Sequence, residues 1–406
     1  MRNVVFQLHW LLGITAGVVL AIVGVTGAVL SFEHQILDLL NADVKKVTVR
    51  PGGPLEPPEL LERIRSAHPD RRILSLVVSG EPDESARVTF AFQGEAGERP
   101  QQGPPGRGPR GESHYVDPYT GELIPGAGNR GEAFFRAAMQ LHRWLMVGGI
   151  GDRDIGRQIV GASTIALIFF AVSGIYLRWP HRRARDWRVW LTFNPRMKGS
   201  RFLWHLHAVA GTWVVVFYLI MGLTGLYWSY EWYRDGLYAL TGTERPQQGP
   251  QGQRGGGVPV AERGEPVTDI SRAWDAFVRE TESHGFSTAT LNLSNGNAIE
   301  IRYLDAAPRH ERAFNTLRVA ADGAVQSHDR YADRPFGARL VASIFPLHSG
   351  SYFGIVGTVL FMFASLAMPL FTVTGWMLYL ERRRRKRMRL SESAPSTARA
   401  APRGFD

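Results

Sequence analysis

The sequence predicts an all-α membrane bundle of four transmembrane helices, built as two parallel two-helix repeats and carrying small α+β domains. Three observations support this fold class: four long apolar segments without charges, two long polar segments between them, and landmarks that recur in both halves. An apolar segment of about 20 residues is needed to cross the hydrocarbon core as a helix. The 406 residues carry a net charge of +10 and no cysteine, which excludes disulfides, cysteine-bound clusters and c-type haem attachment.

Four segments meet the length requirement for a membrane span. They are Trp10–Phe32, Ile159–Leu177, Leu206–Trp228 and Ile355–Leu380. With their flanks, we expect the four transmembrane segments at 1–35, 141–180 (including a periplasmic lead-in), 202–232 and 346–381. The first segment is longer than the apolar region of a signal peptide and no clean cleavage site follows it. We therefore expect a retained anchor.

The charged flanks predict the orientation in the membrane. Arg-rich segments follow the second and fourth spans, at 181–201 and 382–406. Because Lys and Arg are enriched on the cytoplasmic side, we expect both segments and both termini in the cytoplasm of a bacterial inner membrane. The regions 36–140 and 233–345 then face the periplasm. The basic runs flank spans and lack interleaved aromatics, so we expect a lipid bilayer as partner and no nucleic acid.

The two polar regions contain alternating apolar runs that are typical of half-buried strands. These runs are Ile73–Gly80, Ala86–Gly94, Thr288–Asn295, Ala298–Leu304 and Thr316–Val325, and turn residues occupy Asp117–Gly121. Each region also has an insert rich in Gly, Pro, Gln and Arg, at about 94–111 and 247–257, for which we expect disorder. The sequence therefore predicts one small α+β domain in each region.

An internal repeat relates the two halves of the chain. The first span reads LHWLLG, TG and FE, and the third reads LHAVAG, TG and YE at the same offsets. The matched residues are His9 and His207, Gly13 and Gly211, Thr26 and Thr224, and Glu33 and Glu231. An LH pair also precedes the second and fourth spans, which end in VSGIYL and VTGWML. Both copies begin on the same side, so the repeats are parallel and related by an axis along the membrane normal.

Under this symmetry four histidines form two pairs. His9 and His207 face each other near the cytoplasmic surface, and His142 and His348 do so near the periplasmic surface. A single interfacial histidine is usually hydrogen-bonded or solvated. Two repeat-equivalent pairs favour a ligand role instead, because ionisable residues inside a membrane bundle are functional candidates by default.

The pairing of imidazoles favours haem over zinc. Two helices across a symmetry axis place imidazoles on opposite faces of a flat ring, and Gly13 and Gly211 leave room for its edge. Zinc would require three or four ligands at one point, and no carboxylate accompanies these histidines within a span. We therefore expect two b-type haems with bis-histidine ligation. His34, which lacks a repeat counterpart, and His205, which the helix turns about 200° away from His207, are secondary candidates.

Several motifs resemble the PepSY-associated transmembrane family over nearly the whole chain. They are YVDPYTGE at 115–122, the LHxxxG…TG helices, LHRWL at 141–145 and LHSGSYFG at 347–354. The resemblance implies PepSY-like periplasmic domains and haem ligands at the four paired histidines. The sequence departs from the pattern in its second hairpin, which reads AADGAV in place of DPYTGE.

The same resemblance implies a function, because the family includes inner-membrane haem proteins that reduce ferric siderophores in the periplasm. We then expect an oxidoreductase that takes electrons from an unidentified cytoplasmic or membrane donor and reduces a periplasmic Fe(III)-siderophore, with no catalytic side chain of its own. The alternative is a haem-free, membrane-anchored PepSY protein that binds a peptide or a protease. A transporter is a third hypothesis, in which Pro369 kinks the fourth span.

Overall fold

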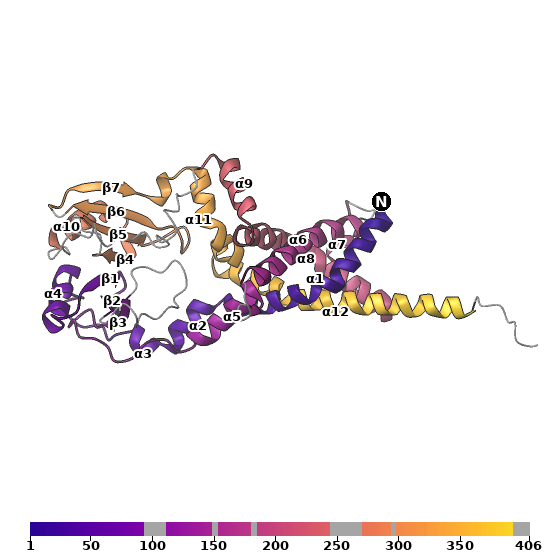
Figure 1. Cartoon of the computed structure of the whole chain (residues 1–406), viewed down its shortest axis with the longest axis horizontal. Helices are drawn as coiled ribbons and strands as arrows, with labels where there is room; N and C mark the ends of the chain where they lie inside the picture. The colour runs from indigo at the N-terminus through magenta and orange to yellow at the C-terminus, as the bar shows by residue number, and fades with distance from the viewer. Residues whose placement is uncertain are drawn as a thin grey trace, which may run out of the picture. The chain divides into compact units, whose positions relative to one another are not determined.

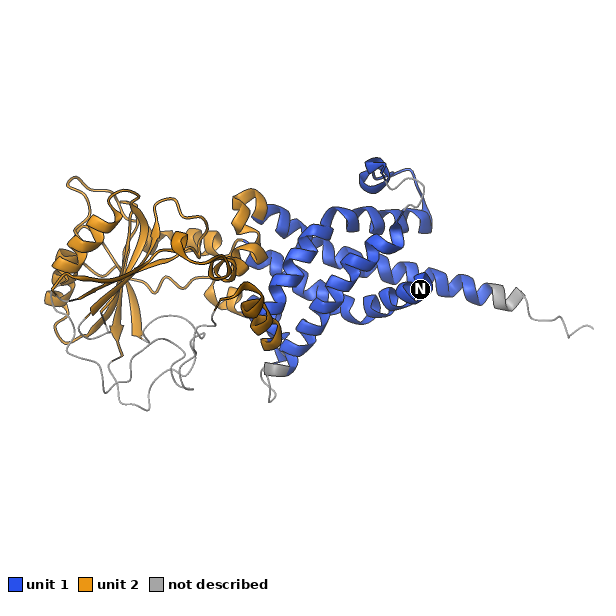
Figure 2. Ribbon diagram, turned by 90° about the horizontal axis from the view of Figure 1, so that it is seen from above, with its two compact units in different colours: residues 1–31, 137–230, 358–406 blue, residues 32–136, 231–357 orange. Residues whose placement is uncertain are grey.

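The computed structural model describes residues 1–92, 111–147, 153–179, 185–243, 270–293, 298–320 and 322–392. It divides into two compact units, each assembled from segments that are distant in sequence (Figure 2). The helical unit comprises residues 1–31, 137–230 and 358–406, and the sheet unit comprises residues 32–136 and 231–357. The two inserts that we expect to be disordered lie almost entirely outside the described residues.

Among the described residues, four helices are long and apolar enough to cross a membrane. They are α1 (Arg2–Leu30), α6 (Arg153–Arg178), α8 (Gly199–Ser229) and α12 (Gly354–Glu392). The four predicted spans are thus confirmed, and the chain is a multi-pass membrane protein. Each helix extends beyond its apolar segment because helical hydrogen bonding continues into the polar flank. As a result, His9 lies inside α1, and the basic run after the fourth span continues α12.

The helices of the two repeats cross through equivalent glycines. A Cβ added at Gly24 of α1 would lie 2.5 Å from the carbonyl oxygen of Ser365 on α12. A Cβ added at Gly222 of α8, the repeat-equivalent position, would lie 2.7 Å from Ile168 on α6. Small residues allow such close approach of helix backbones in membranes. α1 of the first repeat therefore packs closely against α12 of the second, and α8 of the second repeat packs closely against α6 of the first.

Seven strands form one antiparallel sheet in the order β3-β2-β1-β4-β5-β6-β7 (Figure 1). Their bounds are β1 Ile73–Ser79, β2 Ala86–Ala91, β3 Gly111–Val116, β4 Phe286–Asn292, β5 Ala298–Asp305, β6 Asn315–Ala320 and β7 Val325–Asp329. The two polar regions meet where β1 pairs with β4, with Leu76 opposite Leu291. We predicted two separate domains, but the structure joins both regions in one sheet. β1 lies centrally in this sheet, which agrees with its nearly continuous apolar sequence.

Helices α4 (Pro57–Ala67) and α10 (Ser271–Thr281) pack against this sheet, where Ile64 and Phe277 are fully buried. The predicted turn at Asp117 is confirmed, because its side chain accepts a hydrogen bond from the Tyr119 backbone at 2.8 Å. The remaining helices are α2 (Glu33–Leu40), α3 (Ala42–Lys45), α5 (Glu132–Trp144), α7 (Trp187–Leu191), α9 (Glu231–Thr241), η3 (Tyr331–Asp333), α11 (Phe336–Ser349) and η4 (Ser351–Phe353).

Candidate functional site

The imidazole rings of His9 on α1 and His207 on α8 lie together in the helical unit. Their centroids are 6.4 Å apart and their planes make an angle of 66°. A phenylalanine flanks each ring at a repeat-equivalent position: Phe170 lies 5.1 Å from His9, and Phe371 lies 5.2 Å from His207. The structure therefore brings together the inner pair of predicted ligands, and it does so with the symmetry of the repeat.

A hydroxyl group fixes the orientation of each of these rings. Nδ1 of His9 lies 2.8 Å from Oγ of Ser173, and Nδ1 of His207 lies 2.8 Å from Oγ1 of Thr374. Both hydroxyls donate their own hydrogen to the carbonyl four residues earlier in the helix, at 2.5 Å and 2.7 Å. A hydroxyl has only one hydrogen to donate. It must therefore accept from the imidazole, so Nδ1 carries the proton in both rings.

This arrangement leaves the Nε2 lone pair of both rings unused. Among the described residues, Nε2 of His9 and Nε2 of His207 take part in no hydrogen bond. A neutral imidazole with its Nδ1 proton donated to a protein oxygen and its Nε2 lone pair exposed is the form that binds metal ions. Each imidazole of the inner pair thus has a nitrogen available to coordinate a metal ion.

The spacing of the two rings fits a metal ion held between them. Metal–nitrogen bonds to imidazole are about 2.0–2.1 Å in zinc sites, so two rings on opposite sides of one ion have centroids roughly 6 Å apart. The observed separation is 6.4 Å. A Cβ added at Gly13 would meet no atom within 4 Å, and one at Gly211 would meet only the edge of Phe371 at 3.7 Å. Gly13 thus borders open space, as the edge of a haem would require, whereas Gly211 is in van der Waals contact with Phe371.

No larger ligand cluster competes with this pair. Among the described residues, no three His, Asp or Glu side chains gather closely enough to hold a metal ion. Two protein ligands suffice for haem, because the porphyrin supplies the other four nitrogen ligands to the iron. The donor set at His9 and His207 therefore fits a haem iron.

His142 on α5 is held by α1 in a related way. Its Nδ1 lies 3.0 Å from the carbonyl oxygen of Val23 and 3.2 Å from Oγ1 of Thr26. A Cβ added at Gly27 would lie 3.1 Å from the edge of the ring. Burial lowers the pKa of His142 to about 4, which keeps this imidazole neutral near pH 7.

His348 lies in the last turn of α11, two residues before Gly350, whose φ of +84° ends the helix. This residue belongs to the sheet unit, whereas His142 belongs to the helical unit. The outer pair of ligands therefore stays a prediction.

The two secondary candidates lie elsewhere. His34 is exposed on α2 in the sheet unit. His205 lies on α8 two residues before His207, and its ring stacks on Phe193 with centroids 5.7 Å apart and planes at 17°. The predicted turn of His205 away from its neighbour agrees with this contact, so His205 does not share the site of His207.

The TG and SG dipeptides, which mark the repeat in the sequence, have a role in the site that the sequence pattern did not reveal. In three of the spans the dipeptide pairs a hydroxyl that bonds to a histidine with a glycine that lets the ring approach the helix. Cε1 of His9 lies 3.9 Å from a Cβ added at Gly174, and Cε1 of His207 lies 3.8 Å from one at Gly375. The signal was present in the sequence, because a hydroxyl residue precedes glycine in all four spans.

Comparison with known protein families agrees with the motifs. The family of the PepSY-associated TM region matches residues 6–382, which include all four spans and the four paired histidines. No curated protein matches the chain. Since the family match extends over nearly the whole sequence, the chain belongs to the PepSY-associated transmembrane family.

Proposed function

We propose that this protein is a bacterial inner-membrane oxidoreductase that holds two b-type haems between paired histidines and reduces a ferric siderophore in the periplasm. One observation carries the proposal: the imidazoles of His9 and His207 lie 6.4 Å apart, and each donates its Nδ1 proton to a hydroxyl. An isolated structural histidine has no need of a symmetric partner. The family membership supports the same assignment.

The direction of electron transfer follows from the proposed orientation. The basic segments after α6 and within α12 belong on the cytoplasmic side by the positive-inside rule. His9 and His207 then lie near the cytoplasmic face, and the sheet unit lies in the periplasm. Electrons enter at the first pair and leave through the site of His142 and His348.

The protein's residues have three tasks in this function. A bound haem supplies a one-electron carrier that the side chains lack. The histidines hold it, and Ser173 and Thr374 keep their Nδ1 protons in place, which fixes each ring and raises its basicity. The aromatic residues exclude water: Phe371 packs against His207, and its ring centroid lies 5.8 Å from that of Tyr218, whose hydroxyl donates to the Ala364 carbonyl at 2.9 Å.

The sheet unit carries a basic patch that suits an anionic iron chelate. Partial burial, together with the nearby guanidinium groups of Arg312 and Arg334, lowers the pKa of Arg302. Of these three residues, only Arg334 makes an ion pair with a described acid, Asp329, at 2.8 Å. The carboxylate of Glu300 opposes this pKa shift and offsets part of the charge. The positive charge that remains attracts anionic ligands and speeds their association.

A visible spectrum of the detergent-purified protein tests the proposal. We expect a reducible low-spin b-type haem spectrum, and we expect His9→Ala or His207→Ala to remove about half of the bound haem because each breaks one of two bis-histidine sites. His68→Ala is the control, since His68 packs against Phe90 in the sheet unit. A colourless, fully folded protein would contradict the haem assignment.

The alternative function is a haem-free protein that binds a peptide or a protease through its sheet. One observation favours it: β7 is an edge strand of the sheet and most of its side chains are exposed. Such an edge can accept an added strand. A colourless protein that binds extended peptides in a titration would support this alternative.

A further inference from the structure

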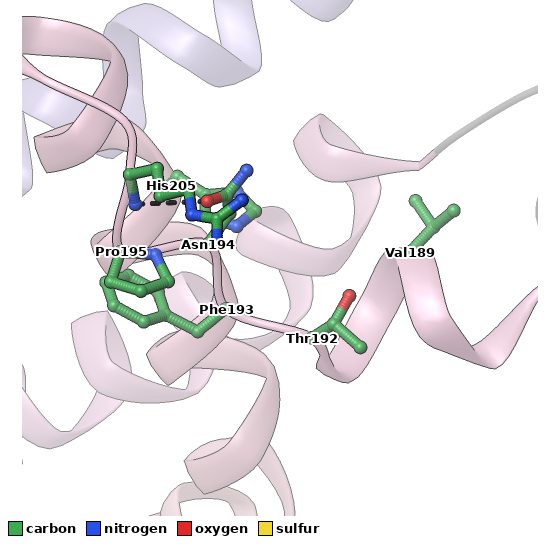
Figure 3. Close-up of a pocket in the computed structure, with 7 residues that line it drawn as sticks. Val189, Thr192, Phe193, Asn194, Pro195 and His205 are labelled. Atoms are coloured by element: carbon green, nitrogen blue, oxygen red, sulfur yellow. Dashed lines mark hydrogen bonds between the residues drawn. The ribbon is translucent and has the colours of Figure 1, made fainter.

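A cavity of about 530 Å³ lies beside α8, the helix that carries His207. It is lined by Val189 and residues 192–196, which follow α6 in the chain, and by His205 of α8. Figure 3 shows Phe193, Asn194 and Pro195 grouped around His205. Since His205 is two residues from His207, the cavity lies next to the proposed entry point for electrons.

Hydrogen bonds fix the wall of this cavity. The guanidinium of Arg178 donates to the carbonyl oxygens of Val189 at 2.7 Å and Ala208 at 2.6 Å. The indole of Trp213 donates to the carbonyl oxygen of Leu191 at 3.0 Å. These bonds fasten α7 to α8, so the cavity is preformed. Together with a bond to the hydroxyl of Thr212, they engage three of the five N–H donors of Arg178.

One polar group in the cavity lacks a partner. Nε2 of His205 is buried and makes no hydrogen bond within the described residues, while the ring itself stacks on Phe193. A buried nitrogen without a partner costs free energy. A ligand that brings a hydroxyl or carbonyl group to this nitrogen would remove that cost.

The lining suits a partly apolar ligand that also carries polar groups, since Thr192 and Asn194 add polar side chains. Arg196 is the only charged residue among the residues that line the cavity, and Val189, Phe193 and Pro195 supply apolar surface. Large apolar side chains on the adjoining helices, among them Trp187 and Trp213, are exposed as membrane-facing residues are. The ligand would thus reach the cavity from the lipid.

We propose that this cavity binds the head group of a membrane hydroquinone, which is the electron donor. Its flat ring packs between the apolar residues beside Phe193, and one hydroxyl bonds to Nε2 of His205. The inference rests on the proposed electron-transfer function. The volume lies within the range of small-molecule sites, about 300–1,000 Å³.

The reaction balances with the acceptor already proposed. One hydroquinone loses two electrons and two protons and becomes a quinone. The electrons leave singly toward the His9–His207 pair and reduce two ferric ions to ferrous ions on the periplasmic side. The two protons pass to cytoplasmic water. His205 holds the ring by a hydrogen bond in this scheme.

Haem reduction by duroquinol, a short hydroquinone, tests the inference in the purified full-length protein. We expect His205→Leu to slow reduction at subsaturating duroquinol at least tenfold, with unchanged haem content and unchanged reduction by dithionite. His68→Leu is the matched control and keeps the rate of the parent protein. Asn194 lies on the exposed side of the cavity, and we expect Asn194→Ala to slow haem reduction as well. This variant replaces His205→Leu in the test if His205→Leu fails to fold. Equal rates in the cavity variants and the parent would overturn the inference.

Equilibrium dialysis with duroquinone provides a readout that does not depend on haem. We expect saturable binding to the parent and to His68→Leu, and loss of binding in His205→Leu. If the protein is purified without haem, the proposed function fails, yet binding that depends on His205 would still support a quinone site. The quinone site would be overturned if duroquinone does not bind, or if anionic lyso-phosphatidylglycerol binds in place of duroquinone.

Discussion

At the scale of single residues, the hydroxyl beside each histidine decides the chemistry of the site. Ser173 and Thr374 each donate to their own helix and must therefore accept from Nδ1–H of His9 and His207. Without these acceptors either nitrogen of the ring could carry the proton. The pair of hydroxyls thus selects one tautomer in both rings and holds both Nε2 atoms ready for a ligand.

Removing one of these hydroxyls should weaken haem binding. We expect Ser173→Ala to lower haem affinity by about 10- to 100-fold, as the loss of an outer partner of a metal ligand typically does. The midpoint potential should rise, because the ring becomes a poorer electron donor to ferric iron. Haem transfer to apomyoglobin and a redox titration measure both effects. Ser173→Thr, which introduces the residue of the second repeat, keeps the hydroxyl and should resemble the parent. An unchanged Ser173→Ala variant would contradict the role of the hydroxyl.

At the scale of secondary structure, glycines set the distance between the spans. Gly24 is buried where α1 crosses α12, and the nearest obstacle to an added methyl group is backbone. Gly17 is also buried, about two turns away on the same face of the helix, but a methyl group there would meet only the side chain of Thr372 at 3.4 Å. Two glycines of one helix therefore differ in how tightly their surroundings constrain them.

This difference predicts opposite responses to the same substitution. We expect Gly24→Ala to destabilise the protein by about 1–3 kcal/mol through overpacking. Gly17→Ala should be neutral or stabilising, because alanine favours a helix over glycine by about 1 kcal/mol. Unfolding in mixed micelles with increasing dodecyl sulfate, followed by circular dichroism, measures both. Equal stability of the two variants would mean that the crossing is looser than the structure indicates.

In the sheet unit, a buried histidine joins three elements. Nε2 of His310 lies 3.0 Å from the hydroxyl of Tyr331 and 3.1 Å from that of Ser343, and Nδ1 accepts from the backbone of Arg312. Because Nδ1 accepts, the ring is neutral in the folded state. Burial lowers the pKa of His310, while the nearby Glu311 opposes this shift and Arg309 adds to it.

The lowered pKa predicts how stability depends on pH. Above the unfolded-state pKa of about 6.5 the ring is neutral in both states, and the full stability is present. As the pH falls below that value, the unfolded state binds a proton more readily, so stability is lost until the folded-state pKa is passed. We expect a lower thermal midpoint at pH 5 than at pH 7, and a smaller difference in His310→Gln. His68→Gln should keep the pH dependence of the parent; a His310→Gln variant that also keeps it would exclude His310 as the cause.

At the scale of the whole molecule, the sequence predicted the spans and the histidines but not the joining of the two polar regions. Span length and absence of charge identify a membrane helix locally, and the repeat identified the partner of His9. The pairing of β1 with β4 joins segments about 200 residues apart. Alternation along a strand sets which face is buried, but not which strand lies beside it. The orienting hydroxyls escaped prediction because their partners lie on other helices.

The proposed direction of electron flow depends on which side of the membrane holds the sheet unit. The chain contains no cysteine. The labelling of a single introduced cysteine therefore reports on which side of the membrane that one residue lies. We expect Ser327→Cys, exposed on β7, to react with a membrane-impermeant maleimide in intact spheroplasts, and Arg384→Cys in the basic end of α12 to react only after permeabilisation. Ser365→Cys, buried between the spans, should remain unlabelled in both. The reverse pattern for Ser327 and Arg384 would invert the topology and, with it, the proposed direction of electron flow.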